Sequence, residues 1–184
     1  MPNEKINVDQ IDNSALVRAI RDMRADFKPE TQNKVINQAL RSTFFLPAVI
    51  KKNTGLVAGA DNKVKFEETP QATFLLITNK ERGTFFPAFT DREDCLHFKS
   101  DKEFQVAVLR FADLAALCER TGEQGMTVNG FIINPYSENL PFTTEMLQGI
   151  KARLAEIRAQ QAQAKAPEGE GKPNITVTTN PDAE

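Results

Sequence analysis

Apolar residues recur along this chain at two spacings, which separate expected helices from expected strands. Four segments carry one apolar face at the helical spacing of three to four residues. Pro29 marks the start of the second helix, because proline favours the first helical position, and Thr143 or Thr144 caps the fourth. The apolar faces are Leu16, Ile20, Met23 and Phe27; Val35, Ile36, Ala39, Leu40 and Phe44; Phe111, Leu114, Ala115 and Cys118; and Leu147, Ile150, Leu154 and Ile157.

The densest apolar run is residues 84–90, with the sequence TFFPAFT. Both faces of this run are apolar, which is typical of a strand buried inside a covered sheet. Pro87 has no N–H to donate, so we expect the strand to be less fully paired from that residue on. Thr90 and Glu93 fit a capping box. They predict a helix that begins at Thr90 and turns inward Cys95, Leu96 and Phe98.

Several shorter runs predict further strands. Residues 79–83 are polar and end in glycine, so we expect them to join two strands in a hairpin. The order of elements is two helices, then hairpins, then strand, helix, strand and helix. This order favours an α+β domain with one mixed, mostly antiparallel sheet and helices packed on it. The strand-like runs are residues 45–50, 56–58, 64–66, 72–78, 104–109 and 131–133.

Composition divides the chain into three parts. Residues 1–29 are an N-terminal extension with one helix, and residues 30–160 form the α+β domain. Residues 161–184 are a polar tail, which we expect to be disordered because it has little apolar surface to offset the entropy of ordering. Within the tail, residues 175–179 read ITVTT and are strand-prone.

The charge and the apolar pattern argue against several classes of protein. The net charge is −2 at pH 7 and no basic cluster is dense, so we do not expect nucleic-acid binding. No apolar run approaches the roughly 18 residues of a membrane span. The N-terminus lacks the apolar segment of a secretory signal, which predicts a cytoplasmic protein with reduced cysteines.

Catalytic and metal-binding patterns were sought and are weak. His97 is the only histidine; Cys95, two residues away, would point about 200° around a helix from it. Glu93 and His97 share a helix face, but an ion pair there is favoured over a metal site that lacks clustered ligands. Residues 55–59 have a glycine spacing without the Lys-Ser/Thr of a phosphate loop. We therefore predict no catalytic residue, no metal and no cofactor.

A set of short motifs occurs in an order that resembles a known family. They are FFPAFT at 85–90, a helix with Phe98 near its end, FADL at 111–114, INP at 133–135, and residues 37–49 ending in PAV. Together they resemble the SseB N-terminal domain family of bacteria over about residues 30–155, with Phe98 where the family usually has tryptophan. The resemblance implies a bacterial cytoplasmic α+β protein. It carries no catalytic motif, and the association of some members with secretion systems points toward protein binding.

Two segments are candidates for binding. The first is the loop of Asn134, Pro135 and Tyr136 with Phe142 nearby, which is either a turn that covers the core or a rim that receives a peptide or small ligand. The second is the tail around Ile175 and Val177, which is either unstructured or adds a strand to a sheet edge.

These observations favour a non-catalytic bacterial protein-interaction or adaptor module. Its partner would be another protein of unknown identity, with neither nucleic acid nor membrane involved, and a homo-oligomer is compatible with the sequence. The alternative is a small-ligand binder or a minor thiol enzyme of serine or sulfur metabolism. In that alternative Cys95 or Cys118 supplies the thiol.

Overall fold

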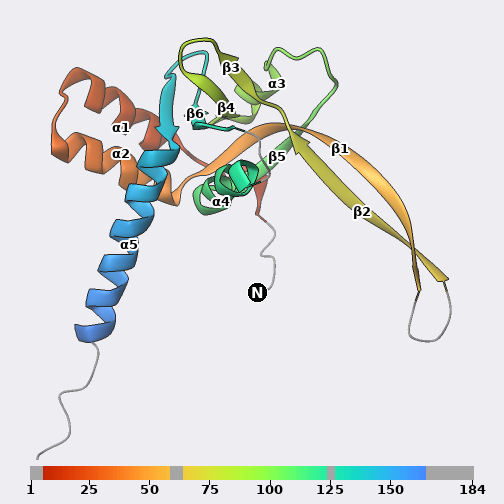
Figure 1. Ribbon diagram of the computed structural model, residues 1–184. Helices are drawn as coiled ribbons and strands as arrows, with labels where there is room; N and C mark the ends of the chain where they lie inside the picture. The colour runs from red at the N-terminus through yellow and green to blue at the C-terminus, as the bar shows by residue number, and fades with distance from the viewer. Residues whose placement is uncertain (1–5, 59–63, 124–126, 165–184) are drawn as a thin grey trace, which may run out of the picture. The chain divides into compact units, whose positions relative to one another are not determined.

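The computed structural model describes residues 6–58, 64–123 and 127–164. The chain forms two compact units, Met1–Gln148 and Gly149–Glu184. In order, the elements are η1 (Val8–Gln10), α1 (Ser14–Ala25), α2 (Pro29–Arg41), β1 (Thr43–Ala58), β2 (Val64–Phe74), β3 (Ile77–Asn79), β4 (Gly83–Ala88), α3 (Arg92–Leu96), β5 (Gln105–Arg110), α4 (Phe111–Glu123), β6 (Gly130–Ile133), β7 (Leu140–Thr143) and α5 (Thr144–Ala164) (Figure 1).

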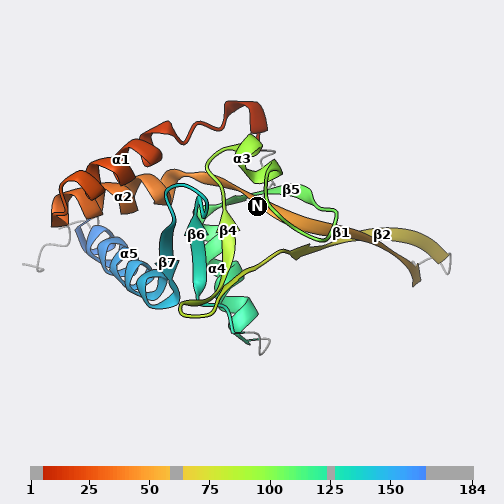
Figure 2. The ribbon, with the colours of Figure 1, turned by 90° about the horizontal axis from the view of Figure 1, so that it is seen from above.

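The α+β class is confirmed, but the described strands divide between two sheets instead of forming one. The first sheet has the order β2-β1-β5 and the second has the order β3-β4-β6-β7. Every neighbouring pair is antiparallel except β4 and β6, which run parallel. Figure 2 shows β4, β6 and β7 side by side in the second sheet.

Strand β4 is central, as its apolar pattern predicts, and four of its six residues are buried. Its residues 83–85 pair with β3 and its residues 86–88 pair with β6. Phe85 directs its backbone toward β3, so Pro87, two residues on, has its nitrogen on the same side, beyond the end of β3. Pairing with β3 stops at Phe85. The predicted loss of pairing from Pro87 on is nevertheless seen only in part, because Pro87 and Ala88 pair with β6 and Phe89 bonds to Phe45.

Within the described parts of the chain, one isolated bridge connects the two sheets. Beyond Pro87, Phe89 exchanges two backbone hydrogen bonds of 2.9 Å with Phe45 of β1. Both phenylalanines are buried, with exposed fractions of 1% and 3%. Because buried backbone groups must be paired, this bridge fixes how the first sheet meets the second.

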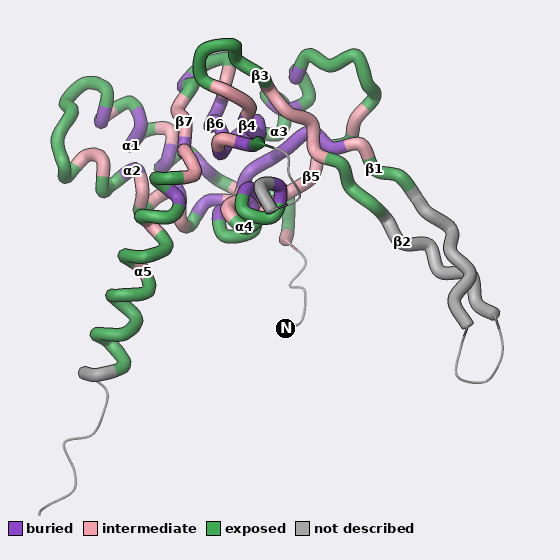
Figure 3. The backbone as a smooth tube through the Cα atoms, viewed as in Figure 1, coloured by how far each residue is buried: buried purple, intermediate pink, exposed green. Residues whose placement is uncertain are grey.

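Phenylalanine rings fill much of the interior. The rings of Phe131 and Phe142 stack with centroids 5.2 Å apart, and Phe111 meets both of them edge-on at 5.7 Å. Phe44 contacts Phe131 at 6.0 Å. In Figure 3 the buried residues concentrate on β4, β6 and the inner part of β1. The prediction of a phenylalanine-packed core is confirmed at these positions.

The N-cap predicted for the helix after β4 is wrong by one residue. Asp91 is the N-cap of α3, and its Oδ1 accepts hydrogen bonds from the backbone N–H groups of Glu93 at 2.8 Å and Asp94 at 3.4 Å. Thr90 is instead buried and bonded to another part of the chain. Cys95 and Phe98 are buried as predicted, but Leu96 is 44% exposed because this five-residue helix ends there.

Two further apolar positions lie outside the core. Phe27 is 72% exposed, because α1 ends at Ala25 and residue 27 no longer follows the helical stripe. Ile157 is 41% exposed on α5. Gly122, predicted to stop its helix, lies one residue before the end of α4.

Strand boundaries depart from the sequence pattern in three places. Residues 45–50 and 56–58 belong to one long strand, β1, which pairs with β2; the connection between them, residues 59–63, lies outside the described residues. The run 72–78 is split between β2 and β3, and the N–H of Leu75 in the break donates to the carbonyl of Pro47. The four-residue strand β7 was not predicted, because Pro141 and its short length give no alternating signal.

Replacing Gly130 by alanine is expected to lower the free energy of unfolding by at least about 1–3 kcal/mol. Gly130 has φ +129°, and an added Cβ would lie 2.0 Å from the carbonyl oxygen of Phe142. Urea denaturation measures the change. Gly149→Ala is the matched control, since nothing lies within 4 Å of that Cβ. Alanine there should raise the free energy of unfolding by about 0.5–1 kcal/mol, because alanine favours a helix more than glycine does. Equal effects of the two substitutions would contradict the conclusion that Gly130 is required by its positive φ and its close contact with Phe142.

Candidate binding surfaces

The predicted binding loop begins at a buried polar residue. Asn134 is 4% exposed and has a positive φ of 45°, which asparagine tolerates better than most residues. Its Nδ2 donates to Thr90 Oγ1 at 2.8 Å, and its Oδ1 accepts from the N–H of Thr90 at 2.9 Å. Asn13 Nδ2 donates to the carbonyls of Thr90 and Thr43, each at 2.8 Å. These contacts hold the loop and the start of α1 against the bridge between the sheets.

Tyr136 is the exposed member of an aromatic cluster. Its side chain is 58% exposed, and its ring lies 6.1 Å from Phe89 and 6.4 Å from Phe98, the latter nearly parallel. Its hydroxyl accepts a hydrogen bond of 3.4 Å from the N–H of Lys99. Phe98 also meets Phe104 edge-on at 5.9 Å. Tyr136 thus covers the core edge and also presents one rigid ring face at the surface.

Of the other predicted binding residues, Phe142 lies away from the surface at Tyr136. Pro135 is half-buried in the turn. Phe142 is 1% exposed and stacked on Phe131, so its ring lies in the core and not at a rim. Ile175 and Val177 lie outside the described residues. The assignment of this set to partner binding therefore stays a prediction, with Tyr136 as its accessible member.

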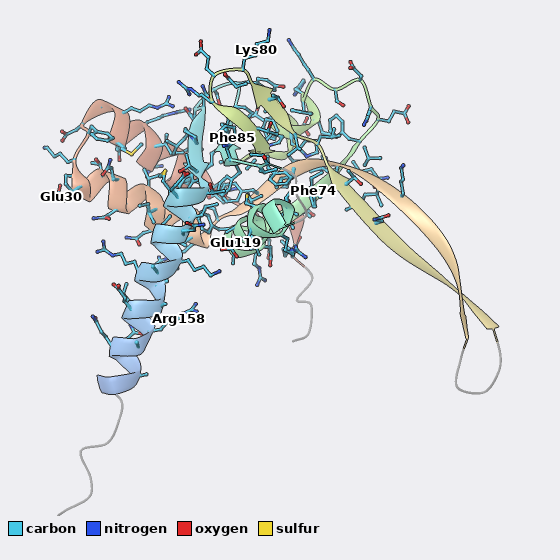
Figure 4. The ribbon with its side chains drawn as sticks, in the orientation of Figure 1. Glu30, Phe74, Lys80, Phe85, Glu119 and Arg158 are labelled. Atoms are coloured by element: carbon cyan, nitrogen blue, oxygen red, sulfur yellow. The ribbon has the colours of Figure 1, made fainter. Side chains whose placement is uncertain are left out.

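A groove of about 660 Å³ lies beside Lys99, whose backbone N–H donates to the Tyr136 hydroxyl. We call it the β2–β3 groove. Its apolar lining is Ala72, Phe74, Leu75, Leu76, Phe86, Phe98 and Leu117. Its polar lining is Gln71, Thr73, Lys99, Ser100, Asp101, Lys102 and Thr121. The ring of Phe74, labelled in Figure 4 at the inner end of β2, meets Phe86 edge-on at 6.2 Å.

Residues 71–74 of β2 line this groove, and the register of the strand indicates where their backbone groups point. Pro47 accepts its hydrogen bond from Leu75 on the β2 side, so the residues of β1 at odd positions direct their backbone groups toward β2. Thr73 and Gln71 are opposite Val49 and Lys51 and satisfy those groups. Ala72 and Phe74 alternate with them, so their N–H and C=O groups face the outer edge. No sequence signal reveals this edge, because it follows from the register.

The cysteines and His97 do not form a reactive centre. Cys95 and Cys118 have exposed fractions of 0% and 1%, whereas His97 is exposed. Burial raises the pKa of each thiol to about 12. The Nδ1 of His97 lies 2.7 Å from the backbone carbonyl oxygen of Glu93 on its own helix. Both thiols are therefore protonated and shielded from solvent at neutral pH.

The part of the chain that the structure describes shows neither a metal-binding cluster nor a membrane-spanning helix. No group of three or more histidine, cysteine, aspartate or glutamate side chains there is arranged to hold a metal ion. No helix there combines the length and apolar character needed to cross a bilayer.

Glu138 is a buried carboxylate that the sequence did not indicate. It is 7% exposed, and its Oε1 accepts from Arg21 Nη2 at 3.2 Å and Nε at 3.3 Å. Arg24 Nη1 lies 3.9 Å from its other oxygen. A buried carboxylate is stable only with charged partners, and here both partners come from α1. The contact therefore holds the far end of the Tyr136 loop against α1, which is a structural role.

Comparisons with known proteins support the resemblance seen in the sequence. The family model described as SseB protein N-terminal domain matches residues 16–149. The match includes most of α1, which the resemblance over residues 30–155 had left out. Searches of curated proteins and of solved structures found no match.

Asn134→Ala is expected to lower the free energy of unfolding by about 1–3 kcal/mol, because Thr90 loses its partners in a buried site. Asn134→Gly separates the causes, since glycine accepts the positive φ at no steric cost but also lacks the amide. Urea denaturation of both variants should show similar losses. A glycine variant as stable as the parent would mean that backbone strain, and not the hydrogen bonds, decides the effect.

Both thiols are expected to resist a disulfide reagent such as DTNB in the folded protein and to react fully in denaturant. The raised pKa values also give a pH dependence. The unfolded chain releases its thiol protons near pH 9 while the native chain keeps them to about pH 12. Stability should therefore fall as pH rises through this window. A Cys95→Ala/Cys118→Ala variant should show a shallower fall, and rapid labelling of the native protein would contradict the burial.

Proposed function

The chain belongs to the SseB N-terminal domain family, and on that premise we propose that it is a protein-interaction module without a catalytic centre. Its binding surface is the β2–β3 groove together with Tyr136. The partner supplies an extended segment that lies in the groove beside β2.

One observation carries this proposal. Outward backbone groups at Ala72 and Phe74 lie beside an apolar floor formed by Leu76, Phe86 and Leu117. A peptide that adds to a sheet edge gains affinity from main-chain hydrogen bonds and specificity from pockets for alternate side chains. The groove offers both features in one place, and Tyr136 adds a rigid aromatic ring of the kind that often anchors an interface.

The charges around the groove indicate the chemistry of the partner. Lys99 and Lys102 line it together with Asp101, which leaves a net positive wall on exposed residues. The fitting partner is therefore an extended segment with apolar residues at alternate positions and an acidic residue near the lysines. Such charges set orientation and association rate more than total affinity.

The alternative function is either a thiol enzyme or a small-ligand binder, and the structure supports these two unequally. Burial of Cys95 and Cys118 and their raised pKa argue against a thiol enzyme. A small-ligand binder remains a second candidate, because 660 Å³ falls within the usual 300–1,000 Å³ of ligand sites. Free amino acids, serine included, can be screened as probes by thermal shift. An increase in melting temperature that Leu76→Glu abolishes would favour this second candidate.

Ala72→Lys is expected to abolish capture of a specific protein from extracts of the native cell by the tagged full chain. A lysine there places a long charged side chain at the edge and floor of the groove, where Ala72 is exposed. Quantitative mass spectrometry compares the proteins retained. Tyr136→Ala should weaken the same capture, by roughly 10-fold for an interface anchor worth about 1.4 kcal/mol.

Ala112→Lys is the matched control, because Ala112 is also exposed but does not line the groove. It should retain the partner as well as the parent chain does. A partner that binds all three variants equally, or no partner with any of them, would contradict the groove as the binding surface. A chain that ends at Ala166 tests the tail separately, and loss of binding there alone would assign it to residues 167–184.

A further inference from the structure

The outer edge of β5 presents unpaired backbone groups. Phe45 directs its N–H and C=O to Phe89, away from β5, so its pair with Val108 has no hydrogen bonds. The same holds for Pro47 and Val106, since the Pro47 carbonyl accepts from Leu75. The N–H and C=O groups of Val106 and Val108 therefore face outward. Among the described residues no strand pairs with this edge.

The other described strand edges are shorter than β5 or interrupted by proline. Strand β2 contains Pro70, which has the parity of Ala72 and so turns its nitrogen outward; this limits pairing on that edge to the end of the strand at Ala72 and Phe74. Strand β7 contains Pro141 and has four residues, and β3 has three. Strand β5 reads QVAVLR, without proline and with its one charge at the end. Natural proteins protect free edges with such devices, so their lack on β5 leaves an edge that can pair with another strand.

An apolar groove follows this edge. Val106 and Val108 are half-buried and line a space of about 720 Å³ together with two of the exposed large apolar residues, Val8 and Leu96. Asp9 and Arg92 lie on its rim with opposite charges. This lining shares no residue with the β2–β3 groove. The edge strand therefore offers apolar side chains and hydrogen-bonding backbone from the same two residues.

We propose that this edge binds a second copy of the chain, with the two β5 strands antiparallel across a two-fold axis at Ala107. In this register Val106 of each copy lies opposite Val108 of the other. Both residues have outward backbone groups, so the pair exchanges four hydrogen bonds. The two three-stranded sheets become one six-stranded sheet, and both groove linings meet on one face.

The charges on this strand are compatible with self-pairing. A residue of one strand and its partner in the other have numbers that sum to 214, which sets Gln105 opposite Leu109 and Arg110 opposite position 104. Arg110 therefore lies opposite Phe104 and next to Glu103 of the other copy, and the two Arg110 residues lie far apart. No two like charges therefore lie directly opposite each other in this register, so the destabilisation that such a pair would cause is avoided. Two-fold dimers are also the commonest closed assembly of identical chains.

Ala107→Cys is expected to give a disulfide-linked dimer under mild oxidation of the full chain. In the proposed dimer Ala107 of one chain lies opposite Ala107 of the other, at a pair without hydrogen bonds. Cα atoms in such a pair lie about 4.5 Å apart, which is within the range of a disulfide. Gln105→Cys is the matched control. It is more exposed, but its two copies would be about 14 Å apart along the strands. Cross-linking of Ala107→Cys should be at least 10-fold faster than that of Gln105→Cys.

Sedimentation equilibrium provides the second measurement. The parent chain should show twice the mass of the chain at high concentration, and Val108→Pro should raise the dimer dissociation constant at least 10-fold. Proline removes only an outward N–H there, so the ladder with β1 remains, which circular dichroism checks. A monomeric parent chain, or equal cross-linking of the two cysteine variants, would overturn the proposal. So would a monomer whose Val106 and Val108 amides exchange slowly with solvent, because another segment would then hold the edge.

Discussion

The bridge between Phe45 and Phe89 is the interaction on which the rest of the first unit depends. Two short backbone hydrogen bonds join strands that are 44 residues apart in the sequence, and both residues are buried phenylalanines. Asn13 and Asn134 bond to the neighbouring Thr43 and Thr90. Because each of these polar groups would be costly to leave unpaired in a buried site, the bridge and its asparagines set the junction of the two sheets, the start of α1 and the loop that carries Tyr136.

The same bridge decides which backbone groups are left at the edges. Phe45 faces Phe89, so every second residue of β1 bonds toward β2 and the alternate ones bond toward β5. That parity turns Ala72 and Phe74 outward on one side and Val106 and Val108 outward on the other. Both surfaces proposed for binding thus follow from the direction of one pair of hydrogen bonds, together with the apolar side chains that each edge carries.

The interior and the surface of this protein have different chemical characters. Inside the described residues lie phenylalanine rings, two protonated thiols and a few fully bonded polar groups. Such an interior contributes to the stability of the fold, because its polar groups are bonded and its thiols stay protonated. The surface, in contrast, has open strand edges beside apolar residues, with an exposed tyrosine near one of them. The proposed binding surfaces therefore lie at these edges.

Local pattern in the sequence was sufficient for the buried strand at Thr84–Phe89, the first-turn proline of α2, the hairpin ending at Gly83 and the α+β class. These features depend on side-chain periodicity and on proline and glycine conformations, which act over a few residues. The division into two sheets, the burial of Phe142, the exposure of Leu96 and the free edges of β2 and β5 were decided only by the tertiary structure. They depend on strand register and on contacts between distant segments, and a one-residue shift in register would exchange the bonded and unbonded positions of each strand.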